Sequence, residues 1–136
     1  MTSSMTTSER FLLDTNVVLR ALKHPASLSP RARKAIMDGS NVLSVVVYWE
    51  VVLKVMKGNV IAGYPRTWWP DALDMLAATA LPIEQAHIDQ ICDLPAIHKD
   101  PFDRMLIAQA FVEGCTLVTT DREILKYKSK RIRVIT

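Results

Sequence analysis

Short apolar runs alternate along the chain with longer stretches in which apolar residues recur at helical spacing. Such runs are typical of strands that are covered on both faces, as in a parallel sheet. Helices between parallel strands return the chain to the same edge of the sheet. The pattern therefore predicts a single three-layer α/β/α domain with a short central parallel sheet, and its strands are expected near residues 11–13, 42–43, 81–83, 116–118 and 132–135.

The helices are predicted from the residues that cap them. Ser29 precedes a helix that Gly39 closes, and Ser44 is a suitable N-cap for the next one, although the valines at 45–47 are equally good strand sequence. A glycine and two prolines between 63 and 70 indicate an irregular link. The expected helices span residues 17–22, 30–38, 45–57, 71–80, 84–92 and 101–113.

The clearest helix start lies at residues 100–103. Asp100 is a good N-cap, Pro101 suits the first helical position, and a negative charge at Asp103 favours the positive end of the helix dipole. At helical spacing, Asp103 also falls in line with Leu106 and Ile107, on the face that points to the interior. A carboxylate placed there needs a partner, so we expect Asp100 to cap the helix and Asp103 to belong to a site.

Four acidic residues are expected to meet at one edge of the sheet. Asp14 and Asp121 each follow a predicted strand, Asp103 begins a helix, and Glu50 lies about two turns into the helix after the second strand. Carboxylates crowded together repel one another unless a cation balances them. With oxygen ligands alone, Mg²⁺ or Mn²⁺ is the natural choice, and hydrolysis of a phosphodiester is the chemistry that such a site suits.

Each acid also has a structural interpretation that the sequence leaves open. Asp14 can be an Asx turn or N-cap between strand and helix, and Asp121 can begin a helix. Glu50 can pair with Lys54 one helical turn away. For Asp103, the inward face favours a functional role.

The histidines and cysteines form no set with metal-ligand spacing. We expect His24 and His87 to be surface or loop residues and His98 to brace the loop before Asp100. Both cysteines, Cys92 and Cys115, are expected to be buried reduced thiols, which fits a reducing compartment.

Composition and charge change this picture little. The 136 residues are 49% hydrophobic and 23% charged, which predicts one globular domain at 10–136 after a flexible polar segment at 1–9. No apolar run approaches the roughly 18 residues of a membrane span, so a cytoplasmic protein is expected. The net charge is only +3, but residues 122–133 carry six basic side chains against one acid. They form either a surface that attracts phosphate or a solvated, edge-protecting terminus.

Four segments of the chain resemble a known family. The chain is similar to PIN-domain proteins of the VapC toxin type, from bacterial VapBC toxin–antitoxin pairs, and the similarity spans nearly its whole length. The motif around Asp-Pro-Phe-Asp-Arg is fairly specific by itself, and the four segments together, in this order and spacing, are strong. They are residues 11–19, 44–50, 100–110 and 117–121.

The resemblance implies a compact α/β/α domain whose acidic Mg²⁺ or Mn²⁺ site cleaves RNA, that is, an endoribonuclease. It implies a homodimer and a cognate antitoxin protein as partners. The family's acidic set, catalytic and metal-binding, corresponds here to Asp14, Glu50, Asp103 and Asp121. The supporting residues would be Asn16, which can orient Asp14, Thr119, Arg104 and the cap Asp100.

Two other functions and one surface feature remain open. A phosphohydrolase would use Asp14 as nucleophile, although the second acid of its usual Asp-x-Asp pair is Asn16 here. A non-catalytic PIN-like module would bind RNA without cleaving it, but such modules lose acids that this chain keeps. The pair Trp68-Trp69 can stack on bases, pack against an antitoxin helix or form a half-buried corner.

Overall fold

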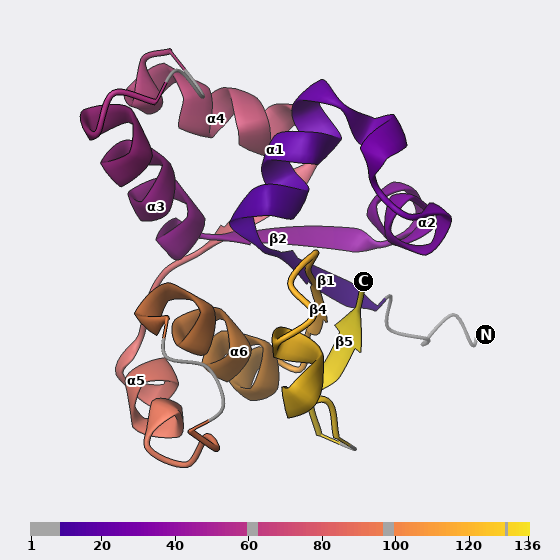
Figure 1. Cartoon of the computed structure of the whole chain (residues 1–136), viewed down its shortest axis with the longest axis vertical. Helices are drawn as coiled ribbons and strands as arrows, with labels where there is room; N and C mark the ends of the chain where they lie inside the picture. Colours follow the sequence, from indigo (N-terminus) through magenta and orange to yellow (C-terminus); the bar gives the residue numbers. More distant parts are fainter. Residues whose placement is uncertain (1–8, 60–62, 97–99, 130) are drawn as a thin grey trace, which may run out of the picture.

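Five parallel strands form the central sheet of the protein (Figure 1). The structure, a computed structural model, describes residues 9–59, 63–96, 100–129 and 131–136. The strand order is β3-β2-β1-β4-β5. The strands are β1 (Arg10–Leu13), β2 (Ser40–Ser44), β3 (Ala78–Leu81), β4 (Thr116–Val118) and β5 (Arg133–Ile135).

Helices cover both faces of this sheet (Figure 1). Helices α1, α2 and α4 lie on one face, and α5 and α6 lie on the other. The α-helices are α1 (Thr15–Lys23), α2 (Pro30–Asp38), α3 (Val45–Met56), α4 (Pro65–Met75), α5 (Gln85–Ile91) and α6 (Pro101–Glu113), with short 3₁₀ helices η1 (Pro25–Ser27) and η2 (Ile124–Tyr127).

Strand β1 shows why the apolar runs predict a covered sheet. Leu12 packs into the core beside α6, whereas Phe11 and Leu13 pack into the core beside α1 and α2. Successive side chains of a strand point to opposite faces, so all three residues are buried only if helices cover both. The predicted three-layer α/β/α architecture is confirmed.

The strand order creates a crevice at the carboxyl ends of β1 and β4. From β1 the chain moves outward to β2 and β3, and it then returns to the other side of β1 to form β4 and β5. The amide of Asp14, just after β1, donates to the carbonyl of Val118 at the end of β4, at 3.0 Å. In open parallel sheets, ligands bind where the direction of winding changes. That point lies between Asp14 and the segment after Val118.

The bounds predicted for one helix and one strand are wrong. The expected helix at 71–80 is α4, which begins at Pro65 and ends at Met75 with Pro70 inside it. The strand expected at 81–83 is β3, where Thr79 and Leu81 pair with Val42 and Ser44 of β2. Its middle residues are exposed at the edge of the sheet, so it lacks the apolar signal of the inner strands.

The structure confirms some of the other local predictions and contradicts one. The valines at 45–47 begin α3, because the hydroxyl of Ser44 accepts from the amide of Val46 at 3.1 Å and caps the helix. Cys115 is buried as expected, but Cys92 is exposed after α5, so that prediction is wrong. The expectation for His98 lies outside the described residues.

Asp100 begins α6 as predicted. Its Oδ1 accepts from the amides of Phe102 at 2.8 Å and Asp103 at 3.3 Å, and Gly114 ends the helix with a left-handed φ of 69°. This cap holds the first helical turn, which carries Asp103.

We expect Asp100→Ala to lower the free energy of unfolding by about 1 kcal/mol, because two amides at the start of α6 lose their acceptor. Asp100→Asn keeps an acceptor of similar strength and should lie close to the wild type. Chemical denaturation of the three proteins measures the difference. If Asp100→Asn loses as much stability as Asp100→Ala, the negative charge of Asp100 matters rather than its capping role.

Candidate active site

Asp14 is a buried carboxylate fixed at both oxygens. It leaves β1 with 5% of its surface exposed, and its Oδ1 accepts from the amide of Val17 at 2.9 Å, which caps α1. Its Oδ2 accepts from the hydroxyl of Thr119, which is itself 1% exposed. Asp14 therefore caps α1, as its structural interpretation expects. Because it is also buried at the switch point of the sheet, it lies where a ligand-binding site is expected.

Thr119 connects Asp14 to Asp121. While its hydroxyl donates to Asp14, the same oxygen accepts from the amide of Asp121 at 3.0 Å. The amide of Thr119 donates to the carbonyl of Ile135 at 2.9 Å, so the threonine is held by the end of β5. Asp121 is half-buried, and its Oδ1 accepts from the amide of Glu123 at 2.9 Å in the turn before η2. One hydroxyl thus links two of the four predicted acids.

Glu50 reaches the same region from α3. Its Oε1 accepts from the hydroxyl of Thr15 at 2.6 Å, and Thr15 is the residue after Asp14. The hydrogen bond of Glu50 in the described part of the chain goes to Thr15 rather than to Lys54, its possible partner one turn away. The ion pair of Glu50 with Lys54, which would give Glu50 a purely structural role, is therefore not formed.

The electrostatics of this cluster favour a cation. Burial raises the pKa of the Asp14 carboxyl, and the nearby charge of Glu50 raises it further, whereas the hydrogen bonds from Thr119 and Val17 act in the opposite direction. A raised pKa means that the site in its metal-free form disfavours the negative charge. A bound divalent cation would remove that penalty, and the oxygen-only donor set fits a hard ion.

Asp103 comes from the other helical layer. It is half-buried in the first turn of α6, one turn before the buried residues Leu106 and Ile107. The neighbouring Phe102 meets Trp49 of α3 edge to face, with ring centroids 4.8 Å apart. Because Trp49 precedes Glu50, the first turn of α6 lies beside the acid-bearing part of α3.

Of the predicted supporting residues, Asn16 lies differently from what the resemblance implies, and Arg104 binds two carbonyl groups. Asn16 is exposed, and the groups that bind Asp14 belong to Val17, Thr119 and Thr120 rather than to Asn16. The guanidinium of Arg104 donates to the carbonyls of Ile91 at 3.2 Å and Pro95 at 3.1 Å. These bonds tie α6 to the segment at the end of α5.

A second group with metal-ligand atoms lies away from these acids. Within the described residues, one ligand atom each of Glu84, His87 and Glu113 lies within 4.8 Å of the others. In the same part of the chain, no three of the four predicted acids come this close together. His87 is fully buried rather than at the surface as predicted. Its Nδ1 accepts from the Glu84 amide at 3.0 Å, so its Nε2 carries the proton and donates to Glu113 at 2.9 Å. The Nδ1 bond belongs to the cap of α5, and the Nε2 bond joins α5 to α6.

The wider spacing of the four acids is compatible with magnesium. Mg²⁺ retains several water molecules and usually takes only one or two carboxylates directly.

Comparison with known families now identifies the domain. The family model of the PIN domain matches residues 11–130. The chain belongs to the PIN domain family. The resemblance seen in the sequence is therefore confirmed, and the match includes all four predicted acids. None of the curated proteins matches the chain.

Solved structures share this fold at low sequence identity. VapBC2 from Rickettsia felis, bound to a promoter DNA fragment, matches with a TM-score of 0.67 and 16% identity over 93% of this chain and 97% of that chain. DNA-bound VapBC from Salmonella typhimurium gives 0.65 and 18% over 93% and 97%. FitAcB from Neisseria gonorrhoeae gives 0.64 and 18% over 93% and 96%. The PIN fold of this chain is thus similar to that found in VapBC toxin–antitoxin complexes.

Two further findings concern the surface. Within the described residues, no helix combines the length and the apolar character that crossing a bilayer requires. Trp49, which the sequence pattern does not single out, is 53% exposed beside Glu50. The signal for it lies in the helical period, because Val46, Val47 and Val51 face the interior and leave Trp49 on the outer side of α3.

We expect Asp14→Asn to stabilise the metal-free protein at neutral pH. Asparagine keeps the oxygen that caps α1 but carries no charge to bury. Since the folded-state pKa of Asp14 is raised, ionisation destabilises the wild type as pH rises from the ordinary value of 3.8 through the raised one. The melting temperature of Asp14→Asn should exceed that of the wild type by a few degrees at pH 7, the shift for about 1 kcal/mol, and the two should converge in acid.

Thermal melts with and without Mg²⁺ provide the control. Magnesium should raise the melting temperature of the wild type more than that of Asp14→Asn, because a ligand that binds only the folded state stabilises it. A variant less stable than the wild type at pH 7 would show that the hydrogen bonds to the charged Asp14 outweigh its burial.

Proposed function

We propose that this protein is a metal-dependent endoribonuclease and the toxin of a type II toxin–antitoxin pair. The observation that carries the proposal is the hydrogen-bonded cluster at the switch point of the PIN domain, in which Thr119 joins Asp14 to Asp121 and Thr15 holds Glu50. Asp103 approaches from α6 beside it. Membership in the PIN family and the similarity to VapBC complexes support the same function.

Mg²⁺ or Mn²⁺ would be held by Asp14, Glu50, Asp103 and Asp121. When bound, such an ion supplies a Lewis acid for the phosphate oxygens and a water molecule acidic enough to act as nucleophile. The donor set consists of carboxylates only, which is the chemistry that these hard ions prefer.

The side chains of the chain itself contribute orientation and charge. The hydroxyl of Thr119 and the amide of Val17 fix the carboxylate of Asp14, so it needs no rearrangement to bind a cation. Thr15 holds Glu50 in the same way. The two threonine hydroxyls are thus used as donors to carboxylates, and His87 is fully buried in the cap of α5. We therefore expect water to attack phosphorus directly, without a covalent intermediate on the protein.

The partners follow from the same proposal. The similar solved structures include complexes whose names are VapBC and FitAcB and one called a toxin–antitoxin complex, from Klebsiella pneumoniae. We infer that a cognate antitoxin protein binds this chain and that the chain forms a homodimer.

The test is cleavage of RNA by the purified protein with Mg²⁺, with Mn²⁺ and with EDTA. Asp14→Asn and Asp103→Asn should each lower kcat/KM by about 100-fold or more, since each removes a charged ligand of the ion. The matched control is Asp74→Asn, which neutralises an exposed aspartate near the end of α4, before the amino end of β3, whereas Asp14 and Asp121 follow the carboxyl ends of their strands; it should keep wild-type activity.

Three results would contradict the proposal. Cleavage that is equal in EDTA and unaffected by Asp14→Asn would exclude the acidic site. Tight RNA binding without cleavage under saturating Mn²⁺ would indicate a non-catalytic RNA-binding module. A trapped phosphoaspartate at Asp14 would indicate a phosphohydrolase.

A further inference from the structure

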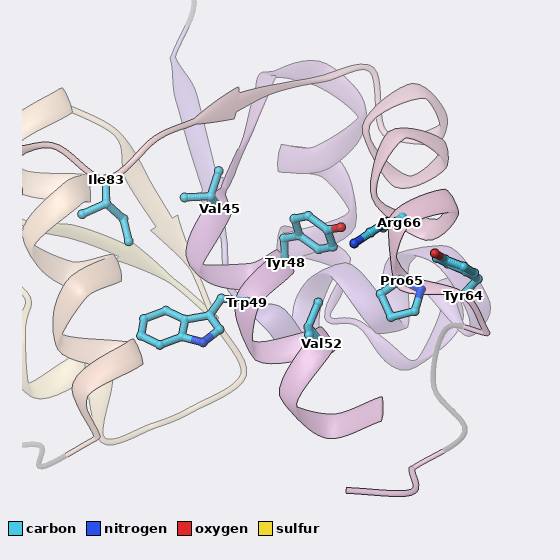
Figure 2. A pocket seen from close by; sticks show the side chains of 8 residues that line it. All are labelled: Val45, Tyr48, Trp49, Val52, Tyr64, Pro65, Arg66 and Ile83. Carbon is cyan, nitrogen blue, oxygen red and sulfur yellow. The ribbon is translucent and has the colours of Figure 1, made fainter. Parts of the chain in front are cut away.

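A groove between α3 and α4 lies next to the acidic cluster. Its volume is about 550 Å³, within the range of small-molecule sites. Trp49 and Tyr48 line it from α3, and Tyr64 and Arg66 line it from the start of α4 (Figure 2).

Trp49 is held in place although half of its surface is exposed. Its ring meets Phe102 at an interplanar angle of 80° with 4.8 Å between centroids, and 53% of the residue remains exposed. Burying a tryptophan face stabilises a protein, so a fixed indole that is left half open has area available for a ligand.

The position of Trp49 ties the groove to the acids. Trp49 directly precedes Glu50 in α3, and its contact Phe102 directly precedes Asp103 in α6. The indole therefore lies between the two helices that carry these acids.

The charge of the groove is opposite to that of the cluster. Among the residues that line it, the charged one is Arg66, which is exposed, and none is acidic. Figure 2 shows the ring of Tyr48 between Trp49 and Arg66, with Arg66 reaching from α4 toward α3. A flat aromatic surface and a guanidinium together match the two parts of a nucleotide, a base and a phosphate.

We propose that Trp49 is the base-stacking platform of this protein: a base next to the cleaved phosphodiester stacks on its indole, and a neighbouring phosphate binds Arg66. This inference rests on the proposed function and specifies its substrate as single-stranded RNA, because a base in a duplex is already stacked on its neighbours. It also gives Trp49 a different role from Trp68 and Trp69.

Trp68 and Trp69 are less suited to stacking. Both are half-buried and pack against the core beside α1, and Trp69 stacks on Tyr48 with 5.1 Å between centroids. One face of Trp69 is thus used within the protein, as expected for a half-buried corner of the domain.

The experiment measures binding of two fluorescent probes to the full chain in EDTA, where the proposed cleavage cannot proceed. One probe is a short oligouridylate, and the other is a ribose-phosphate oligomer of the same length without bases. Trp49→Ala should weaken binding of the oligouridylate about 5- to 100-fold and leave binding of the abasic oligomer unchanged, since stacking on an aromatic side chain contributes about 1–3 kcal/mol per base. Trp49→Phe should retain part of the affinity.

Two further variants serve as comparisons. Arg66→Ala should weaken both probes by a similar factor and reduce the salt dependence, because it removes a phosphate contact. Met56→Ala removes another exposed apolar side chain of α3, outside the groove, and should change neither affinity.

The outcomes separate this proposal from the proposed function. If the wild type cleaves RNA but Trp49→Ala binds both probes as the wild type does, stacking is excluded while the nuclease remains. If the wild type cleaves no RNA but the base-dependent loss is observed, the stacking site is supported and the nuclease is not. Equal weakening of both probes by Trp49→Ala, or no binding of either probe by the wild type, overturns the stacking site. Dissociation of a dimer by Trp49→Ala, with RNA binding unchanged, also overturns it and assigns the groove to contact between copies.

Discussion

The hydrogen bond from Thr119 to Asp14 is the contact on which the arrangement of the site depends. It connects the residue after β1 to the residue after β4, the two strands between which the direction of winding changes. The same carboxylate caps α1 through Val17, and the same hydroxyl holds the amide of Asp121. The side chains of Asp14 and Thr119 therefore connect the start of α1, the ends of β1 and β4, and Asp121. The geometry of the cluster thus follows from the fold itself.

The burial of the Asp14 carboxylate lowers the stability of the fold. A carboxylate with 5% of its surface exposed loses most of its hydration, and two hydrogen bonds offset only part of that loss, as the raised pKa of Asp14 indicates. Glu50, bound to Thr15, adds like charge nearby. Within the described residues no basic group faces this buried charge, so we expect the metal-free fold to be less stable with Asp14 than with a neutral residue there. That is the usual relation between a functional site and stability, since the site is arranged for a ligand rather than for the ligand-free state.

The sequence predicted most reliably what is decided by neighbours in the chain. The cap at Asp100, the end of α6 at Glu113 and the helix start at Ser44 depend on local hydrogen bonds, and the structure has all three. The bounds of α4 and β3 depend on tertiary packing. Trp68 and Trp69 hold a helix that contains a proline, and β3 is an exposed edge strand that is recognisable only by its pairing with β2. The prediction for His87 was wrong for a similar reason, because its partner Glu113 comes from another helix, α6.

The four acids could be identified from the sequence, because strand ends and motif spacing indicate them. The side chains that pack beside them could not be predicted in this way. Trp49 and Glu50 are adjacent in α3, and Phe102 and Asp103 are adjacent in α6. Successive residues of a helix point about 100° apart, so Trp49 can contact α6 while Glu50 binds Thr15. The edge-to-face contact of Trp49 with Phe102 places the first turn of α6, which carries Asp103, beside the part of α3 that carries Glu50. Trp49 and Phe102 are 53 positions apart in the sequence, so no local motif predicts that they meet, and only packing brings the residues beside Glu50 and Asp103 together.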